Sequence, residues 1–285
     1  MKTTVALYIC IMAFTLVGGC TDHSLSVEND CQIPTSLMTA KEGSFWIYQR
    51  TQLDTLGNPI GDPSMSAKLQ IYDTLTLLGR DAAYSYQGVT ALMLEDRYSE
   101  DYGLTFRKDT VYWVMTPDAM YVNTTAMQRQ SCECPSSTLL RWRRYENCAE
   151  TYKIYADTLY QGDTYPSMKT DSLGNSVVFT KSILVGIKNF TKMIASEKMT
   201  VNGKSIATKK SQSYLGLWNT FNSPTPEDVT FLNGKKTIGV YDDRTVWTNR
   251  DIGIVKERSI VSNDGNLWDT PRGFERMLIR YSIVR

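Results

Sequence analysis

The stretch "KLQIYDTLTLL", residues 68–78, decides the fold class. Its apolar and polar residues alternate with a period of two. One face carries Leu69, Ile71, Leu75 and Leu77, and the other carries Lys68, Gln70, Tyr72, Thr74 and Thr76. Because successive side chains of a strand point to opposite faces, the stretch predicts a β-strand with one buried face.

Similar strand and turn patterns occur elsewhere along the chain. "ERMLIRYSIV" (275–284) predicts a last strand that buries Met277, Ile279, Tyr281 and Ile283. "LTFRKDTVYWVM" (104–115) predicts two strands around Lys108-Asp109, and "KMTVNGKSIATKK" (198–210) predicts a hairpin that turns at Asn202-Gly203. Helical periodicity is best over residues 117–129, where we expect a short helix. We therefore predict one all-β, mainly antiparallel domain over residues 41–285, as a curved sheet or unclosed barrel with few short helices.

The beginning of the chain resembles a bacterial lipoprotein signal. An apolar run over residues 5–17 is too short to span a bilayer, and it leads to "LVGGC" (16–20). This ending resembles a lipobox, which implies cleavage after Gly19, a diacylglycerol on the sulfur of Cys20 and acylation of the new amine. Residues 1–19 would then be a signal peptide and residues 20–40 a lipidated tether. An ordinary signal peptide with an incidental cysteine is the alternative.

This resemblance places the protein in a Gram-negative cell envelope. Two or more acyl chains hold a protein stably on a membrane, so the membrane is the first expected partner. Thr21 stands where some lipoproteins carry the aspartate that retains them at the inner membrane, which favours the outer membrane. The oligomeric state is left open.

The charge balance argues against a nucleic-acid partner. The formal net charge is +1, and loss of residues 1–19 removes Lys2, which leaves equal numbers of acidic and basic residues. A balanced chain lacks the basic surface that binds nucleic acid or grips anionic lipid.

Cysteines predict two disulfides in the mature chain. Besides Cys20, the candidates are Cys31, Cys132, Cys134 and Cys148. An even count in an exported protein favours disulfides over zinc, and a bond between Cys132 and Cys134 would be strained. We prefer Cys134–Cys148 with Cys31–Cys132, and the reverse pairing is the alternative.

The sequence lacks the residues that the common catalytic sites need. The single histidine, His23, lies in the tether, so no Ser-His-Asp triad and no histidine metal site can form. No phosphate-binding or dinucleotide motif is present. Adjacent acids such as Glu95-Asp96, Glu100-Asp101 and Asp242-Asp243 point to opposite faces of a strand, and we expect them to be solvated. We predict no catalytic residues, no metal and no cofactor, and therefore no enzyme.

Aromatic residues make up 11% of the chain, mostly as Tyr and Trp on predicted strands. Core packing is their ordinary role. The alternatives are a stacking platform for sugar rings or the lining of an apolar pocket. In "LLRWRRY" (139–145), Arg141, Arg143 and Arg144 crowd Trp142 and Tyr145. We expect a solvated face there, with arginine stacked on aromatics or an anion-contacting patch as alternatives.

Two stretches resemble uncharacterised lipoproteins of the LolA/LolB-like class. These are "GSFWIYQRT" (43–51) and "VWTNRDIGIVKERSIVSNDG" (246–265), the latter followed by Leu278 and Tyr281. The resemblance implies a curved antiparallel sheet around a helical plug, with Trp247 packed inward. It also implies a binding module for an apolar or lipid-like molecule. The alternative is a structural or accessory surface lipoprotein that contacts glycans or other envelope proteins.

Five positions share the pattern Asp, Ser or Thr, then an aliphatic residue. Their hydroxyl residues are Thr55, Thr74, Thr110, Thr158 and Ser172. The pattern resembles the acceptor motif for O-glycosylation in the periplasm of certain Gram-negative bacteria. Thr55 and Ser172 are preferred, because both stand in similar turns, "DTLGN" and "DSLGN". The alternative is that Asp-Thr simply marks a turn that leads into a strand.

Overall fold

A computed structural model of the 285-residue chain describes residues 36–54, 57–60, 71–99, 104–124, 142–170, 172–219, 240–261 and 273–285. Within these ranges no helix has both the length and the apolar character needed to cross a membrane. The predicted signal peptide, Cys20 and the predicted tether as far as residue 35 lie outside the described residues, so the anchor stays a prediction.

Twelve strands make a single antiparallel sheet in this part of the chain. They are β1 (Phe45–Leu53), β2 (Ile71–Tyr86), β3 (Val89–Tyr98), β4 (Arg107–Met115), β5 (Ala119–Thr124), β6 (Arg143–Glu146), β7 (Lys153–Thr170), β8 (Ser176–Val201), β9 (Lys204–Asn219), β10 (Val240–Asn249), β11 (Gly253–Val261) and β12 (Gly273–Ser282). A short 3-10 helix, η1 (Leu37–Thr39), precedes them. The prediction of an all-β, mainly antiparallel fold is confirmed.

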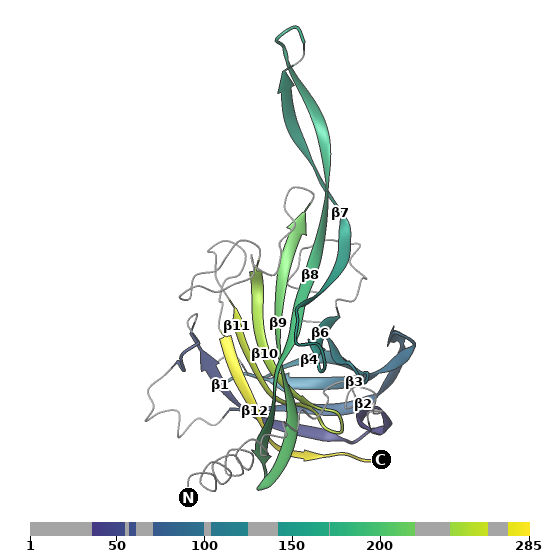
Figure 1. The fold of residues 1–285 in the computed structure, drawn as a ribbon, viewed down its shortest axis with the longest axis vertical. Coiled ribbons are helices and arrows are strands. Elements are labelled where there is room, and N and C mark those ends of the chain that lie inside the picture. Colours follow the sequence, from purple (N-terminus) through teal and green to yellow (C-terminus); the bar gives the residue numbers. More distant parts are fainter. Residues whose placement is uncertain are drawn as a thin grey trace, which may run out of the picture.

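The sheet curls into a half-barrel (Figure 1). Its order is β6-β5-β4-β3-β2-β1-β12-β11-β10-β9-β8-β7, so the first and last strands meet in the middle. They pair from Phe45↔Ser282 to Leu53↔Gly273 with one register shift, and we call this junction the β1–β12 seam. In Figure 1, β2, β3 and β4 run across β9, β10 and β11. The two halves of the sheet therefore face each other.

The alternating stretch forms β2 as predicted. Ile71, Leu75 and Leu77 are buried, while Tyr72 is exposed. Asp73 shares the buried face, with no exposed surface. One face of the strand is thus turned into the fold.

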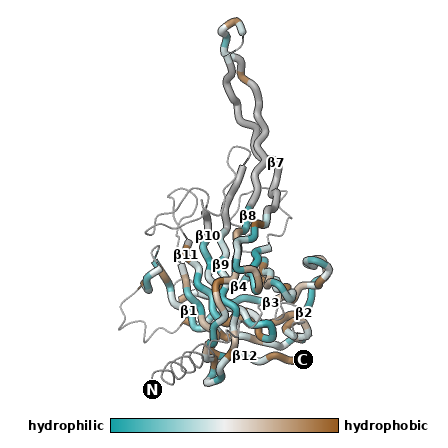
Figure 2. Tube along the Cα trace, in the orientation of Figure 1, coloured by the Kyte–Doolittle hydropathy of each residue, from teal (hydrophilic) through white to brown (hydrophobic). Residues whose placement is uncertain are grey.

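Strands β7 and β8 form a hairpin that projects from the body (Figure 1). From Val185↔Asn219 toward the hairpin tip, the described residues of β8 pair only with β7, as far as Thr170↔Ser176. At about 3.3 Å per residue, the 26 residues of β8 span roughly 85 Å. Part of the tip is coloured hydrophobic in Figure 2, and Leu173 and Val178 there are 84% and 64% exposed.

Turns were predicted well, and segments buried on both faces were not. The hairpin at Asn202-Gly203 is confirmed, with φ angles of 49° and 73°. The predicted helix is wrong where the chain is described, because residues 119–124 form β5. Lys108-Asp109 lies inside the single strand β4, so the prediction of two strands is also wrong.

The expected buried face of the last strand is wrong as well. In β12 the buried side chains are Arg276 and Leu278, while Met277 and Ile279 are only half-buried. An ion-pairing arginine occupies an inward position there, so hydropathy alone selects the other face. Tyr281 and Ile283 do pack against the core.

Candidate functional site

The apolar part of the interior is filled by large side chains. Trp46 and Trp113 pack edge to face, with ring centroids 5.3 Å apart and no exposed surface. The Trp46 Nε1–H donates to the Ile252 carbonyl oxygen at 2.7 Å, and the Tyr48 hydroxyl donates to that of Ile254 at 2.7 Å. A Cβ at Gly253 would lie 2.7 Å from the Trp113 ring. These groups fill the apolar part of the core.

A buried ion network continues the interior along the β1–β12 seam. Arg276 bonds to Glu257 at 2.8 Å and to Asp96 at 3.0 Å. Two further pairs, Arg50–Asp73 at 2.9 Å and Arg244–Glu257 at 2.8 Å, flank it. Three arginines thus face three acids, and the strands concerned run from β3 to β10 through the seam. The expectation that Asp96 is solvated is wrong, because its side chain turns inward to Arg276.

Burial sets the protonation equilibria of this network. Desolvation raises the pKa of Asp96 to about 6, although the nearby Arg276 guanidinium lowers it. Desolvation also raises the pKa of the Tyr48 hydroxyl well above its ordinary value. The Asp96 carboxyl therefore takes up a proton at a pH well above that of an ordinary aspartate.

The free edge of β6 is held by side chains of the opposite half of the sheet. The Arg144 backbone N–H donates to Asn189 Oδ1 at 2.8 Å, and the Glu146 N–H donates to Thr191 Oγ1 at 3.2 Å. Arg143 Nε donates to Ser213 Oγ at 3.2 Å. We call this group the β6 clasp. It consists of Arg143, Arg144, Glu146, Asn189, Thr191 and Ser213.

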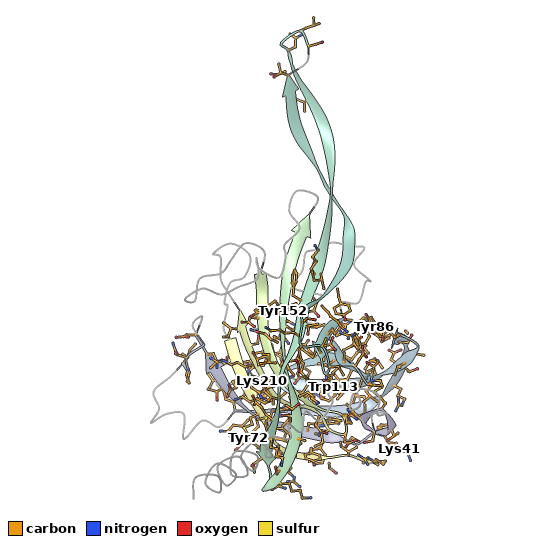
Figure 3. The ribbon with its side chains drawn as sticks, viewed as in Figure 1. Lys41, Tyr72, Tyr86, Trp113, Tyr152 and Lys210 are labelled. Atoms are coloured by element: carbon orange, nitrogen blue, oxygen red, sulfur yellow. The ribbon has the colours of Figure 1, made fainter. Side chains whose placement is uncertain are left out.

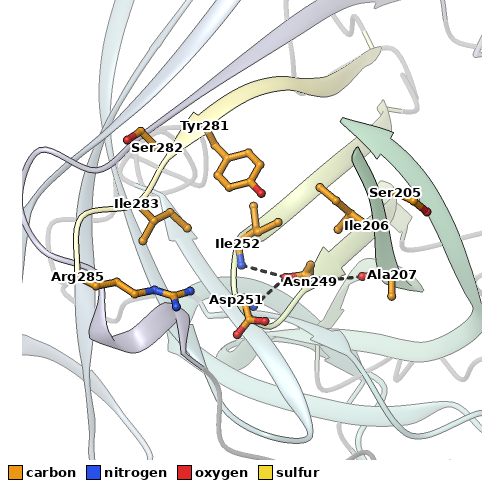
Figure 4. A pocket seen from close by; sticks show the side chains of 10 residues that line it. All are labelled: Ser205, Ile206, Ala207, Asn249, Asp251, Ile252, Tyr281, Ser282, Ile283 and Arg285. Atoms are coloured by element: carbon orange, nitrogen blue, oxygen red, sulfur yellow. Dashed lines mark hydrogen bonds between the residues drawn. The ribbon is translucent and has the colours of Figure 1, made fainter. Parts of the chain in front are cut away.

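A pocket of about 600 Å³ lies between the start of β9, the turn from β10 to β11 and the end of the chain after β12 (Figure 4). It is lined by Ser205, Ile206, Ala207, Asn249, Asp251, Ile252, Tyr281, Ser282, Ile283 and Arg285. Asn249 organises one wall, because its Nδ2 donates to the Ala207 carbonyl oxygen at 2.8 Å and its Oδ1 accepts from the Asp251 N–H at 2.8 Å. Half of the lining is polar, so this pocket is not the apolar one that a binding module for a lipid-like molecule would need.

Aromatic side chains gather on the outer face of β2 to β5. On β4, Trp113 points into the core, so Tyr112 and Val114 point to the opposite face. There the Tyr84 ring stacks on Tyr112 with centroids 3.8 Å apart, and Tyr86 lies 4.3 Å from Tyr121 and 5.5 Å from Trp142. We call Tyr84, Tyr86, Tyr112, Tyr121 and Trp142 the outer aromatic cluster. Figure 3 marks Tyr86 on the flank of the body below the hairpin.

The cluster has two layers: two buried tyrosines below and three half-buried rings above them. Tyr112 and Tyr121 are 5% and 1% exposed, whereas Tyr84, Tyr86 and Trp142 are half-buried. Desolvation raises the pKa values of Tyr112 and Tyr121, so both hydroxyls stay protonated across the physiological range. The half-buried rings are therefore supported from below by rigid packing.

Arg144 borders this cluster, and its positive charge is paired with two acids. It pairs with Asp118 at 2.7 Å and Glu146 at 2.8 Å, and its guanidinium lies over the rings of Tyr121 (5.2 Å) and Tyr155 (4.6 Å). Its hydrogen bonds to the two acids outweigh desolvation and raise its pKa. The expectation of a solvated arginine face is wrong for Arg143 and Arg144, which are buried. Arg141 lies outside the described residues.

Trp247 is buried, but not in the interior. It stands directly opposite Lys210 and Lys256 on the neighbouring strands, and both ammonium groups lie about 5 Å from its ring. Its Nε1–H donates to Glu197 Oε2 at 2.8 Å, while the neighbouring Val246 joins the core. The inward position that the resemblance implied is wrong, because the alternation of β10 turns Trp247 outward.

The remaining candidate residues, the cysteines and the O-glycosylation positions, lie in separate parts of the molecule. Cys148 is half-buried just after β6, and Cys31, Cys132 and Cys134 lie outside the described residues, so the disulfides stay a prediction. Ser172 is exposed at the hairpin tip, whereas Thr74 and Thr110 are half-buried within strands. Thr55 and the side chain of Thr158 lie outside the description. No group of three potential metal ligands occurs among the described residues.

The sequence shows that aromatic residues are frequent on the strands, but it does not predict that five of them form one cluster. "YSYQ", "VYWVM" and "RWRRY" each supply rings to the outer aromatic cluster, yet nothing local indicates that these rings share a face. The stacked pair Tyr84 and Tyr112 comes from β2 and β4, which are separated by β3.

Comparisons with known proteins identify no family. No family model matches the chain, and no curated protein matches it in sequence. One solved structure, described as that of an exported protein with a YMCC-like fold from Bacteroides fragilis, is similar over 85% of this chain and 97% of its own. Its TM-score is 0.36 and its sequence identity is 12%.

Proposed function

We propose that the mature protein is a non-catalytic accessory protein of the cell envelope, anchored through Cys20, which binds its partner on the outer surface of the half-barrel. This is the second of the two functions that the sequence suggests. The first, a container for an apolar molecule, requires an interior that its own side chains leave open.

The filled interior carries this proposal. The fully buried Trp46, Trp113 and Tyr48 occupy the apolar part of it, and the ion network around Arg276 occupies the part beside the seam. Burying an acyl chain against paired charges would cost desolvation without a compensating hydrogen bond. An acyl chain would therefore have to displace either packed aromatic rings or ion pairs.

The absence of catalysis is supported by residue types. The single histidine, His23, lies in the tether, and in the described sheet the three buried acids of the ion network are each bonded to an arginine. Because these carboxylates are buried and already accept hydrogen bonds from arginine side chains, they are not placed to take a proton from a substrate.

A lipid measurement tests the proposal. The full-length processed protein is purified in detergent and extracted with chloroform–methanol, and the extract is quantified by mass spectrometry against deuterated phospholipid standards. We expect far less than one non-covalent lipid per protein. We also expect no saturable change in tryptophan fluorescence on titration with palmitate. One mole of lipid per mole of protein, or a saturable palmitate response, would overturn the proposal and make the container the better function.

The anchor is tested separately. Cys20→Ala should abolish cleavage after Gly19 and the lipid-dependent mass increase of the N-terminal peptide, because the thiol is the group that accepts the diacylglycerol. Cys10→Ala, within the signal peptide, is the matched control and should be processed normally. Unchanged cleavage in Cys20→Ala would rule out the lipobox.

A further inference from the structure

We propose that the outer aromatic cluster is a binding site for a neutral saccharide. The inference rests on the proposed surface function and names its partner class. Three observations carry it: the arrangement of the rings, the charge around them, and the fixed polar groups at their border.

The rings form a supported platform. Tyr112 covers one face of Tyr84 at 3.8 Å with an interplanar angle of 6°, so the exposed part of Tyr84 comes from its other face and edge. Tyr86 bridges Tyr121 and Trp142. The apolar C–H face of a pyranose packs on such rings with little loss of side-chain entropy, since the rings are already held in place.

The local charge excludes an anionic partner. The positive charge of Arg144 is more than matched by Glu146 and Asp118, and Asp81 adds a further negative charge near Tyr112. Among the described residues at this border, a phosphate, sulfate or uronate would meet more acidic than basic side chains, and the Arg144 guanidinium there is already paired.

The same contacts disfavour a cationic partner. Arg144 already lies over the rings of Tyr121 and Tyr155, and the Tyr84 and Tyr112 rings cover each other. Arg144 thus already places a positive charge at the Tyr121 and Tyr155 rings, which repels a second cation there, whereas an uncharged pyranose can still pack on the free face of Tyr84. A neutral polyol with an apolar face is the chemistry that remains.

Polar groups at the border are held ready for hydroxyls. The Asp118 side chain is 46% exposed, and its Oδ1 accepts from the Thr116 hydroxyl at 2.5 Å while its Oδ2 accepts from Arg144 at 2.7 Å. Each carboxylate oxygen keeps a further lone pair to accept a bond from a sugar hydroxyl.

The size of the platform favours a saccharide over a protein. A stable protein interface needs about 800 Å² on each partner and anchors that are well exposed before binding. Here the floor residues Tyr112 and Tyr121 are already buried, and only the half-buried Tyr84, Tyr86 and Trp142 offer surface. A few partly exposed rings match one or two sugar units.

Calorimetry on the full-length protein in detergent tests the inference. The probes are maltohexaose, cellohexaose, mannohexaose and, as the anionic comparison, hexagalacturonate. We expect at least one neutral oligosaccharide to bind and hexagalacturonate not to bind. Tyr84→Ala and Trp142→Ala should weaken that binding by about tenfold or more, while Tyr84→Phe, which keeps the ring, should stay within about threefold.

The matched control is Phe106→Ala, which removes a 40% exposed aromatic ring from another part of the same half of the sheet and should leave binding unchanged. Circular dichroism of each variant separates loss of the site from loss of the fold. Binding of none of the neutral probes, or equal binding by wild type and a folded Tyr84→Ala, would overturn the saccharide site. Neither result touches the lipid measurement, so a failure here is distinguishable from a failure of the surface function.

Discussion

The half-barrel is joined at two places by different means: β1 meets β12 through a backbone ladder, whereas β6 meets β8 and β9 through side chains. At the β1–β12 seam, nine pairs run from Phe45↔Ser282 to Leu53↔Gly273. At the β6 clasp, the Asn189 and Thr191 side chains accept hydrogen bonds from backbone N–H groups of β6. In a continuous sheet, these N–H groups would bond to the backbone of a neighbouring strand.

The difference shows how each junction depends on sequence. The hydrogen bonds of the β1–β12 ladder join backbone groups, so most side-chain substitutions leave them intact. The sequence affects the stability of the seam mainly through the large residues that pack beneath it. The clasp depends on a few polar groups, each of which leaves a buried partner unsatisfied when it is removed. Substitutions should therefore act through packing at the seam and through individual hydrogen bonds at the clasp.

The largest effect is expected beneath the seam. Trp46→Ala removes a fully buried indole, its contact with Trp113 and its bond to Ile252. We expect the free energy of unfolding to fall by about 3–5 kcal/mol, because a cavity of this size cannot collapse fully. Urea unfolding followed by circular dichroism measures this, with Phe106→Ala as the exposed control. A loss below 1 kcal/mol would mean that the seam does not depend on packing.

The next effect depends on pH and concerns the ion network at the seam. The pKa of Asp96 is about 6 in the folded protein, against 3.8 without the fold, because burial disfavours the charged form. The folded state therefore binds more protons between these values, and this stabilisation is complete below pH 4 and lost as the pH rises through 6. It amounts to roughly 3 kcal/mol.

Urea unfolding of wild type and Asp96→Asn between pH 4 and 8 checks this. The stability of wild type relative to the variant should fall across the range, while Glu95→Gln controls for the loss of a carboxyl from the outer face of the same strand. Parallel profiles for wild type and Asp96→Asn would contradict the buried-acid interpretation.

Asp118, beside the clasp, should show the opposite sign. Partial burial opposes its ionisation, but hydrogen bonds from Thr116 and Arg144 outweigh this and hold its pKa below the ordinary value. Its contribution is present above pH 4 and is lost as the pH falls further. Asp118→Asn should therefore flatten the acid limb of the unfolding profile. If the variant and wild type lose stability alike below pH 4, the clasp is not the acid-sensitive junction.

A smaller loss is expected at the clasp. Asn189→Ala leaves the Arg144 N–H and the Tyr214 carbonyl oxygen without the bonds that Asn189 provides. We expect a loss of about 2 kcal/mol and faster hydrogen exchange at the β6 amides, with β1 and β12 unaffected. Thr208→Val, which removes a buried hydroxyl from β9 outside the clasp, is the control. Unchanged exchange in β6 would show that the side-chain bonds do not hold this edge.

The smallest effect is expected outside both junctions, at the hairpin tip. Ser172→Ala should change stability by less than about 0.5 kcal/mol, because the side chain is exposed. In a host that glycosylates the Asp-Ser/Thr-aliphatic motif, intact-mass analysis should show the loss of one glycan from this variant. Thr110→Ala, half-buried in β4, should lose none. Retention of the full mass by Ser172→Ala would remove the tip as an acceptor.

The sequence predicted the regular parts of this comparison and missed the clasp. Alternation identified β2, and Asn202-Gly203 identified a hairpin, because both signals are local. β5 is buried on both faces, so it lacks alternation, and the sequence wrongly predicts a helix there. The sequence predicts a solvated face at Arg143 and Arg144, because their partners Ser213 and Asn189 stand 70 and 45 residues away and nothing local indicates them. Long-range pairing of polar groups has no local signature.

The continuity of β8 has a mechanical consequence. The same strand forms one side of the projecting hairpin and, at Asn189 and Thr191, holds the β6 edge. A pull along the hairpin axis would load the ladders to β7 and β9 in shear, where many bonds share the force. A sideways push at the tip would act through a long lever arm and would twist β8 at its base. The clasp would bear that torque first, so a load on the hairpin would be transmitted to the junction that closes the half-barrel.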